Sequence, residues 1–251
     1  MRENFFRYNV VVKYKKPQWL IGIDEAGRGP LAGPVAVGGI LVPAGFDFSV
    51  FSVVADSKKL SPKTRERVFG EVQRAAKKGD LKFHVALISE KIIDAKGISF
   101  AIRKGIAEVL EMLTSEALEC VYKSSDTRRI GAKTRAVLVR TVSGLSDAGN
   151  EVAEDFRRTL VEVRLDGSLH APKEYLFQKT IIKGDVTEPA ISLASIMAKV
   201  MRDRKMIVLG KKYPVYRFEI HKGYGTKIHR EAIAHHGLSA VHRKSFCKKW
   251  C

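Results

Sequence analysis

Short runs of branched apolar residues recur along the chain and mark the expected strands. The runs at 19–23 and 35–42 are typical of neighbouring buried strands, joined by a stretch rich in glycine and proline. Strand-like runs return at 82–88, at 159–165 and, more briefly, at 180–183. The pattern therefore predicts strands distributed over most of the chain.

Longer amphipathic segments lie between these runs. Apolar residues at near-helical spacing predict helices over 61–78, 98–113 and 188–212. Thr187 is a candidate cap for the last of them. The segment 221–237 combines a glycine-rich turn with a further helix that ends at glycine.

Strands that alternate with helices favour an α/β fold, with a central sheet covered by helices. The economical division is one main domain over 18–212, preceded by an extension at 1–17. A basic helical segment, 213–251, is expected to pack on that domain. Residues 114–158 are polar and basic around a short apolar run, and we interpret them as an insert of uncertain structure.

The charge balance narrows the class of partner. The 251 residues include 45 Lys and Arg against 27 Asp and Glu, and the formal net charge of +18 is spread along the chain. Such a surface favours polyanions, nucleic acid among them. The same excess also fits a generally basic surface, so the charge becomes informative only beside a site.

The cysteines and the lengths of the apolar runs indicate where in the cell the protein is expected. The three cysteines lack CxxC spacing, which suggests neither a disulfide framework nor a thiolate zinc site. No apolar run approaches ~18 residues, so a membrane span is not expected. We therefore expect a cytoplasmic protein, and we expect it to be a monomer.

Two adjacent carboxylates, Asp24 and Glu25, follow the first apolar run. Successive side chains of a regular strand point to opposite faces, so both can serve one site only where the pleat ends. The following Ala26-Gly27 supplies such a break. The pair fits a metal site, although an Asp-Glu pair at the end of a strand is more often a solvated turn.

An arginine flanked by glycines follows the acidic pair. In Gly27-Arg28-Gly29 the backbone can approach a ligand closely, and the arginine can contact phosphate. Bared amides could also meet a ribose 2′-hydroxyl. The alternative is that the glycines only build a tight turn before Pro30.

These motifs belong to a series of blocks that resembles one family. The blocks are IGIDEAGRGPLAGPV at 21–35, DSKKLS at 56–61, LDG at 165–167, IKGD at 182–185, ASIMAKVMRD at 194–203 and HKGYGT at 221–226. In this order they are similar to ribonuclease HII, a type 2 ribonuclease H family. The tail HRKSF adds a weaker match.

The resemblance implies an RNase H-like α/β fold with a central mixed sheet, and a catalytic role for the main domain. It implies a divalent-metal-dependent endonuclease that acts on the RNA strand of RNA/DNA hybrids and 5′ of ribonucleotides embedded in duplex DNA. The products would carry 3′-hydroxyl and 5′-phosphate ends. Ribonuclease HIII has a sizeable N-terminal domain, whereas about twenty residues precede the first strand here, so ribonuclease HII is preferred.

The resemblance assigns four catalytic carboxylates, which would hold Mg²⁺ or Mn²⁺ in a two-metal site: Asp24, Glu25, Asp166 and Asp185. Asp203 competes for the fourth place. If 188–203 is helical, a rise of ~1.5 Å per residue puts Asp203 more than ~20 Å along the axis from Asp185. Asp203 is therefore interpreted as a structural ion-pair partner.

The same resemblance assigns the substrate contacts. Gly27, Arg28 and Gly29 would read the ribose, and Tyr224 would pack near the sugar at the RNA-to-DNA step. Phosphate contacts are expected from three lysines: Lys58, Lys59 and Lys183.

The sequence is also compatible with two other functions. A nucleic-acid-binding protein that does not cleave would explain the charge and the glycine loop, and an RNA-modification or ribosome-maturation factor would bind RNA without a DNA strand. Zinc is not expected from His229, His235 and His236, because matching ligand spacing is absent from the sequence. His235 and His236 are expected to face solvent or phosphate.

Overall fold

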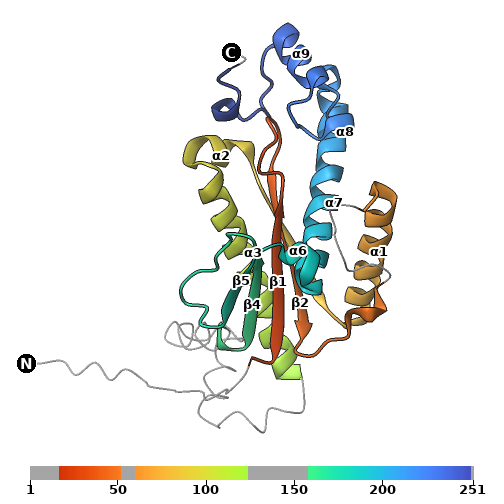
Figure 1. Ribbon diagram of the computed structural model, residues 1–251, viewed down its shortest axis with the longest axis vertical. Helices are drawn as coiled ribbons and strands as arrows, with labels where there is room; N and C mark the ends of the chain where they lie inside the picture. The colour runs from red at the N-terminus through yellow and green to blue at the C-terminus, as the bar shows by residue number, and fades with distance from the viewer. Residues whose placement is uncertain (1–16, 52–59, 124–157, 250–251) are drawn as a thin grey trace, which may run out of the picture.

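A five-stranded sheet forms the centre of the molecule. The computed structural model describes residues 17–51, 60–123 and 158–249 (Figure 1). The strands run in the order β3-β2-β1-β4-β5. Their bounds are β1 Trp19–Ala26, β2 Val35–Pro43, β3 Lys82–Ile88, β4 Val161–Asp166 and β5 Gln178–Ile181.

The sheet is mixed, and its register sets the positions of the acidic residues. β1 pairs antiparallel with β2, which pairs antiparallel with β3, whereas β1, β4 and β5 are parallel neighbours. Ile23 of β1 lies opposite Leu165 of β4. Parallel strands end at the same edge of a sheet, so Asp24 and Asp166 lie close to each other at that edge.

Helices cover both faces of the sheet. α1 (Pro62–Lys78) and α7 (Pro189–Lys212) pack on one face, and α2 (Glu90–Lys96) and α3 (Ile98–Lys123) lie on the other (Figure 1). Apolar side chains of each layer meet those of the strands in separate clusters, one with α3 and one with α1 and α7. The expected α/β fold is confirmed.

A third apolar cluster joins the C-terminal segment to the end of α7. Its buried residues include Leu31 from the loop after β1, Met206 from α7 and Phe218. This segment contains η3 (Pro214–Tyr216), α8 (Phe218–His221), α9 (Lys227–His236) and η4 (Lys244–Phe246). A β-bridge between Ala32 and His242 places it beside the loop that follows β1.

Several elements differ from those predicted, among them α2, which the sequence pattern did not indicate. α3 continues to Lys123 because Ala117, Leu118 and Val121 remain buried, so the expected insert begins with helix. The rest of that insert, 124–157, lies outside the described residues. The predicted strand at 180–183 is the earlier β5, and Glu188 rather than Thr187 occupies the cap position of α7.

The remaining short helices are η1 (Phe48–Val50) and α6 (Gly184–Thr187). Within the described ranges, no helix has the length and apolar character needed to cross a membrane.

Candidate active site

Asp24 and Glu25 both reach one cavity at the end of β1. Asp24 is only 3% exposed, and its Oδ1 accepts a hydrogen bond from the Glu25 backbone N–H at 2.7 Å. The Glu25 side chain forms an ion pair with Arg28 at 3.1 Å. β1 ends at Ala26, and Gly27 has a φ of +93°, so the break in the pleat occurs where the sequence indicates it.

Two further carboxylates lie beside this pair. Asp166 is the last residue of β4 and lines the same cavity. Asp185 is buried in α6, and its backbone N–H donates to Asp166 Oδ1 at 3.4 Å. Asp185 thus adjoins Asp166 without being part of the cavity lining.

The electrostatics of Asp24 reflect this crowding. Burial raises the pKa of Asp24 well above its ordinary value, and the neighbouring carboxylates of Glu25 and Asp166 raise it further. Hydrogen bonds from the Ser195 side chain and the Glu25 amide act in the opposite direction. A cation placed among these oxygens would remove the penalty.

The donor set fits a divalent cation of the Mg²⁺ or Mn²⁺ type, because all of the candidate ligands are carboxylate oxygens. Among the described residues, however, no three acidic, histidine or cysteine side chains already form a metal-binding group. The structure gathers three carboxylates at one cavity, with the fourth adjacent to Asp166.

The cavity has a volume of about 500 Å³ and combines acidic, basic and glycine residues. Its lining is Asp24, Glu25, Ala26, Gly27, Arg28, Gly29, Arg65, Asp166, Ser195, Lys199 and Tyr224. Most of the residues assigned from the sequence thus meet at one place.

The two glycines of the loop have different surroundings. Gly27 is buried, and a Cβ there would lie 2.0 Å from Nε of Arg202. Gly29 is exposed, and a Cβ there would meet nothing within 4 Å. Packing thus excludes a side chain at Gly27, whereas the space beside Gly29 is open to a ligand.

Tyr224 lines the cavity from the turn between α8 and α9 and is 42% exposed. Its ring centre lies 6.0 Å from Nζ of Lys199 and 5.8 Å from the guanidinium carbon of Arg202. Lys183 is exposed just before α6, with a φ of +57°, and does not line the cavity. Lys58 and Lys59 lie outside the described residues.

Sequence reasoning missed three residues of the cavity: Arg65, Ser195 and Lys199. Ser195 and Lys199 are four residues apart on α7, so helical spacing places them on one face, and that signal was available. Lys199 also forms an ion pair with Asp203 at 2.8 Å, which confirms the ion-pair role expected for Asp203. Arg65 carries no comparable signal.

The histidines divide into a buried and an exposed group. His235 and His236 are exposed, as expected. His229 is fully buried and stacks on His221, with ring centres 4.4 Å apart. Its Nε2 lies 3.1 Å from Nε2 of His242, while its Nδ1 lies 2.9 Å from the Tyr224 carbonyl oxygen. These rings form part of the C-terminal core beneath the Tyr224 turn.

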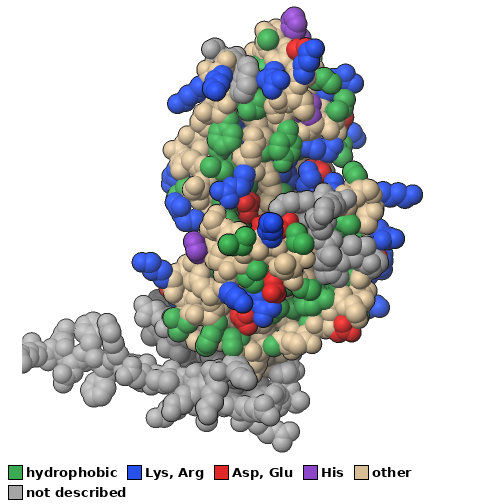
Figure 2. All heavy atoms as spheres, in the orientation of Figure 1, with side chains coloured by type: hydrophobic (Ala, Val, Ile, Leu, Met, Phe, Trp, Pro, Cys, Tyr) green, Lys and Arg blue, Asp and Glu red, His purple; other side chains and the backbone are tan. Residues whose placement is uncertain are grey.

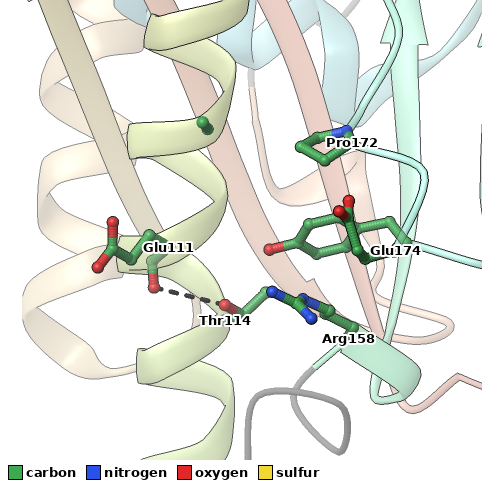
Figure 3. A pocket seen from close by; sticks show the side chains of 7 residues that line it. Glu111, Thr114, Arg158, Pro172 and Glu174 are labelled. Carbon is green, nitrogen blue, oxygen red and sulfur yellow. Dashed lines mark hydrogen bonds between the residues drawn. The ribbon is translucent and has the colours of Figure 1, made fainter. Parts of the chain in front are cut away.

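A second cavity, of about 310 Å³, lies between α3 and the segment after β4 (Figure 3). Glu111, Thr114, Arg158 and Glu174 line it, and the Thr114 hydroxyl donates to the Glu111 carbonyl at 3.4 Å. None of the four candidate carboxylates contributes to it. The cavity at the end of β1 is therefore the candidate active site.

Basic side chains are not confined to that cavity. Figure 2 shows Lys and Arg side chains over much of the visible face, with acidic side chains among them. The surface therefore agrees with the charge distribution read from the sequence.

Comparison with known proteins identifies the family. The family model described as Ribonuclease HII matches residues 21–249. Ribonuclease HII of Bacillus anthracis is 35% identical over 240 residues, which are 96% of this chain and 73% of the relative. Ribonuclease HII of Caldicellulosiruptor saccharolyticus is 33% identical over 249 residues, covering 98% of this chain and 95% of the relative.

Solved structures share the fold. The ribonuclease H2 from Pyrococcus horikoshii OT3 superposes with a TM-score of 0.55 at 20% identity, covering 92% of this chain and 96% of that one. Bst-RNase HIII in complex with Mn²⁺ gives a TM-score of 0.54 at 14% identity, covering 92% of this chain and 65% of that one. The chain belongs to the ribonuclease HII family, endonucleases that hydrolyse the RNA of RNA/DNA hybrids.

Proposed function

We propose that this ribonuclease H cleaves the RNA strand of hybrids and also cuts duplex DNA on the 5′ side of an embedded ribonucleotide, leaving 3′-hydroxyl and 5′-phosphate ends. The observation that carries the proposal is the meeting of Asp24, Glu25 and Asp166 with the Gly27–Gly29 loop and Tyr224 around one cavity. The cavity thereby combines candidate metal-binding carboxylates with a glycine loop and a tyrosine suited to contact a sugar.

Asp24, Glu25, Asp166 and Asp185 would hold Mg²⁺ or Mn²⁺. When bound, the two ions would supply activation of water and charge stabilisation at the leaving 3′ oxygen. The raised pKa of Asp24 supports this assignment, because a buried and crowded carboxylate is stabilised by a cation. The remaining residues bind and orient the substrate.

Substrate binding is assigned to groups that face the cavity. The backbone amides of Arg28 and Gly29, two exposed residues of the cavity lining, would approach the ribose, and the Tyr224 ring would pack against the sugar. Lys199 and Arg65 would contact phosphate from α7 and α1, in addition to the lysines expected from the sequence. We further propose that the enzyme acts as a cytoplasmic monomer.

The test uses a DNA duplex that contains one ribonucleotide and is labelled at both ends of the cut strand. The wild type should cut once, 5′ of the ribonucleotide, with Mg²⁺ or Mn²⁺, and Asp24→Asn should lose at least about 100-fold in rate. Binding without a cut in either metal would overturn the proposal and favour a non-catalytic binding protein. Equal binding to pure RNA would favour an RNA-maturation role.

A further inference from the structure

Two fully buried arginines lie beneath the loop that follows β1. Arg202 belongs to α7 and Arg243 to the segment after α9, and each has 0% exposure. Across the described ranges, their side chains donate to backbone carbonyls and form no ion pair with a carboxylate. Burial lowers the pKa of Arg202 and lowers that of Arg243 to about 9, so both guanidinium charges are held in the interior at a cost.

Arg243 binds backbone carbonyls at both ends of the loop. It donates to the carbonyls of Gly27 at 2.8 Å and Arg28 at 2.9 Å. It also donates to Gly33 at 2.9 Å and Pro34 at 3.0 Å. The planar guanidinium fork is suited to several such bonds at once. One side chain therefore ties the two ends of the loop together.

Arg202 connects the same loop to the turn that carries Tyr224. It donates to the carbonyls of Pro34 at 2.9 Å and Ala32 at 3.3 Å. Its Nη1 donates to the carbonyl of Lys222 at 3.0 Å, two residues before Tyr224. Loop and turn, which come from distant parts of the chain, thus share one buried side chain.

The direction of the loop amides follows from peptide geometry. In a trans peptide group the C=O and the N–H point in opposite directions. Because the carbonyls of Gly27 and Arg28 point at Arg243, the N–H groups of Arg28 and Gly29 point away from it. Neither N–H donates to another group of the described chain, and both residues are exposed and line the cavity.

We propose that Arg243 is a positioning residue for ribose recognition, because it holds two loop carbonyls inward and thereby directs the Arg28 and Gly29 amides to the 2′-hydroxyl of the substrate. Arg202 keeps this loop aligned with Tyr224. The inference rests on the proposed function of the loop as the ribose reader. A lysine would retain the charge but lacks the planar fork that binds carbonyls at both ends of the loop.

The test compares affinity for two duplexes that differ by a single ribonucleotide. Fluorescence anisotropy in EDTA at fixed salt gives the dissociation constant of each duplex without cleavage. Arg243→Lys should reduce the ribonucleotide preference at least about fivefold, the equivalent of one hydrogen bond, and leave affinity for the all-DNA duplex nearly unchanged. Arg204→Lys is the matched control, since Arg204 is an exposed residue of α7 that pairs with Glu66.

A variant with cooperative unfolding and undiminished ribonucleotide preference overturns the inference, because the loop would then be positioned without the guanidinium. If Arg243→Lys does not fold, the same affinities are measured for Arg202→Lys. Undiminished ribonucleotide preference in a folded Arg202→Lys variant would also overturn the inference. A wild type that does not distinguish the two duplexes overturns the proposed ribose-reading role itself. Loss of preference in the arginine variants, with preference intact in Arg204→Lys, supports the inference.

Discussion

Gly27 lies directly against the buried guanidinium of Arg202: a Cβ on Gly27 would come within 2.0 Å of Arg202 Nε. The glycine also has a φ of +93°, which side chains disfavour. The fold itself therefore requires glycine at position 27, independently of any ligand. The second, Gly29, meets no such restriction.

Gly27→Ala should therefore destabilise the protein. The added methyl group meets both the unfavourable φ and the Arg202 side chain, so we expect a loss of at least about 2 kcal/mol in the free energy of unfolding. Urea denaturation measures this directly. A variant as stable as the wild type would show that the loop and Arg202 can move apart readily.

Gly29→Ala should separate stability from activity. We expect a change in the free energy of unfolding within about 1 kcal/mol, because the new methyl group has open space around it. Cleavage at a single ribonucleotide should fall at least about tenfold, since the methyl group enters the space proposed for the ribose. Unimpaired cleavage by the folded variant would place the ribose elsewhere.

Asp24→Asn should stabilise the metal-free protein while it abolishes cleavage. The pKa of Asp24 is raised by burial and by the carboxylates of Glu25 and Asp166, so the ionised form is unfavourable at neutral pH. A neutral amide of similar shape relieves that cost, and we expect a gain of about 1 kcal/mol or more. Thermal unfolding in EDTA tests this, and an equal loss of stability would contradict it.

The stability of the protein should decrease as the pH is lowered, because two histidines are buried in the neutral form. Burial lowers the pKa of both His229 and His242 to about 4, below the ordinary value of 6.5. Between these pH values the unfolded chain binds more protons than the folded one, so stability is full above about pH 6.5 and declines toward pH 4. Urea denaturation across this range measures the decline.

A matched pair of variants assigns that pH dependence. His229→Gln should flatten the decline, because it removes one buried group that resists protonation. His235→Gln, at an exposed position of the same helix, should retain it. The same slope in both variants would assign the decline to other groups.

The sequence predicts those helices and strands in which a regular apolar pattern continues over the whole segment. The helix over 188–212 and the strands at 35–42 and 82–88 appear with nearly the expected bounds. α3 extends further than expected because polar residues around Ala117 and Val121 obscure an apolar face that remains buried. Apolar spacing therefore suffices to predict the position of a helix or strand where the pattern is regular.

Other features depend on tertiary contacts that no local pattern encodes. No local pattern distinguishes Arg202 and Arg243 from exposed arginines, yet both are buried, and backbone carbonyls from the loop after β1 accept their hydrogen bonds. His229 is likewise buried by its packing with His221 and His242. The local pattern indicated Asp24 and Glu25 as a candidate pair, whereas Asp166 and Asp185 were assigned through motif blocks far apart in the chain.

The central claim is that Asp24, Glu25, Asp166 and Asp185 together form a single two-metal site. Calorimetric titration of the metal-free protein with Mn²⁺ tests it, using Asp185→Asn against Asp203→Asn, whose carboxylate pairs with Lys199. We expect Asp185→Asn to weaken Mn²⁺ binding at least about tenfold and Asp203→Asn to leave it within about twofold of the wild type. Unaltered Mn²⁺ binding by Asp185→Asn, or an equal loss in both variants, would contradict the account.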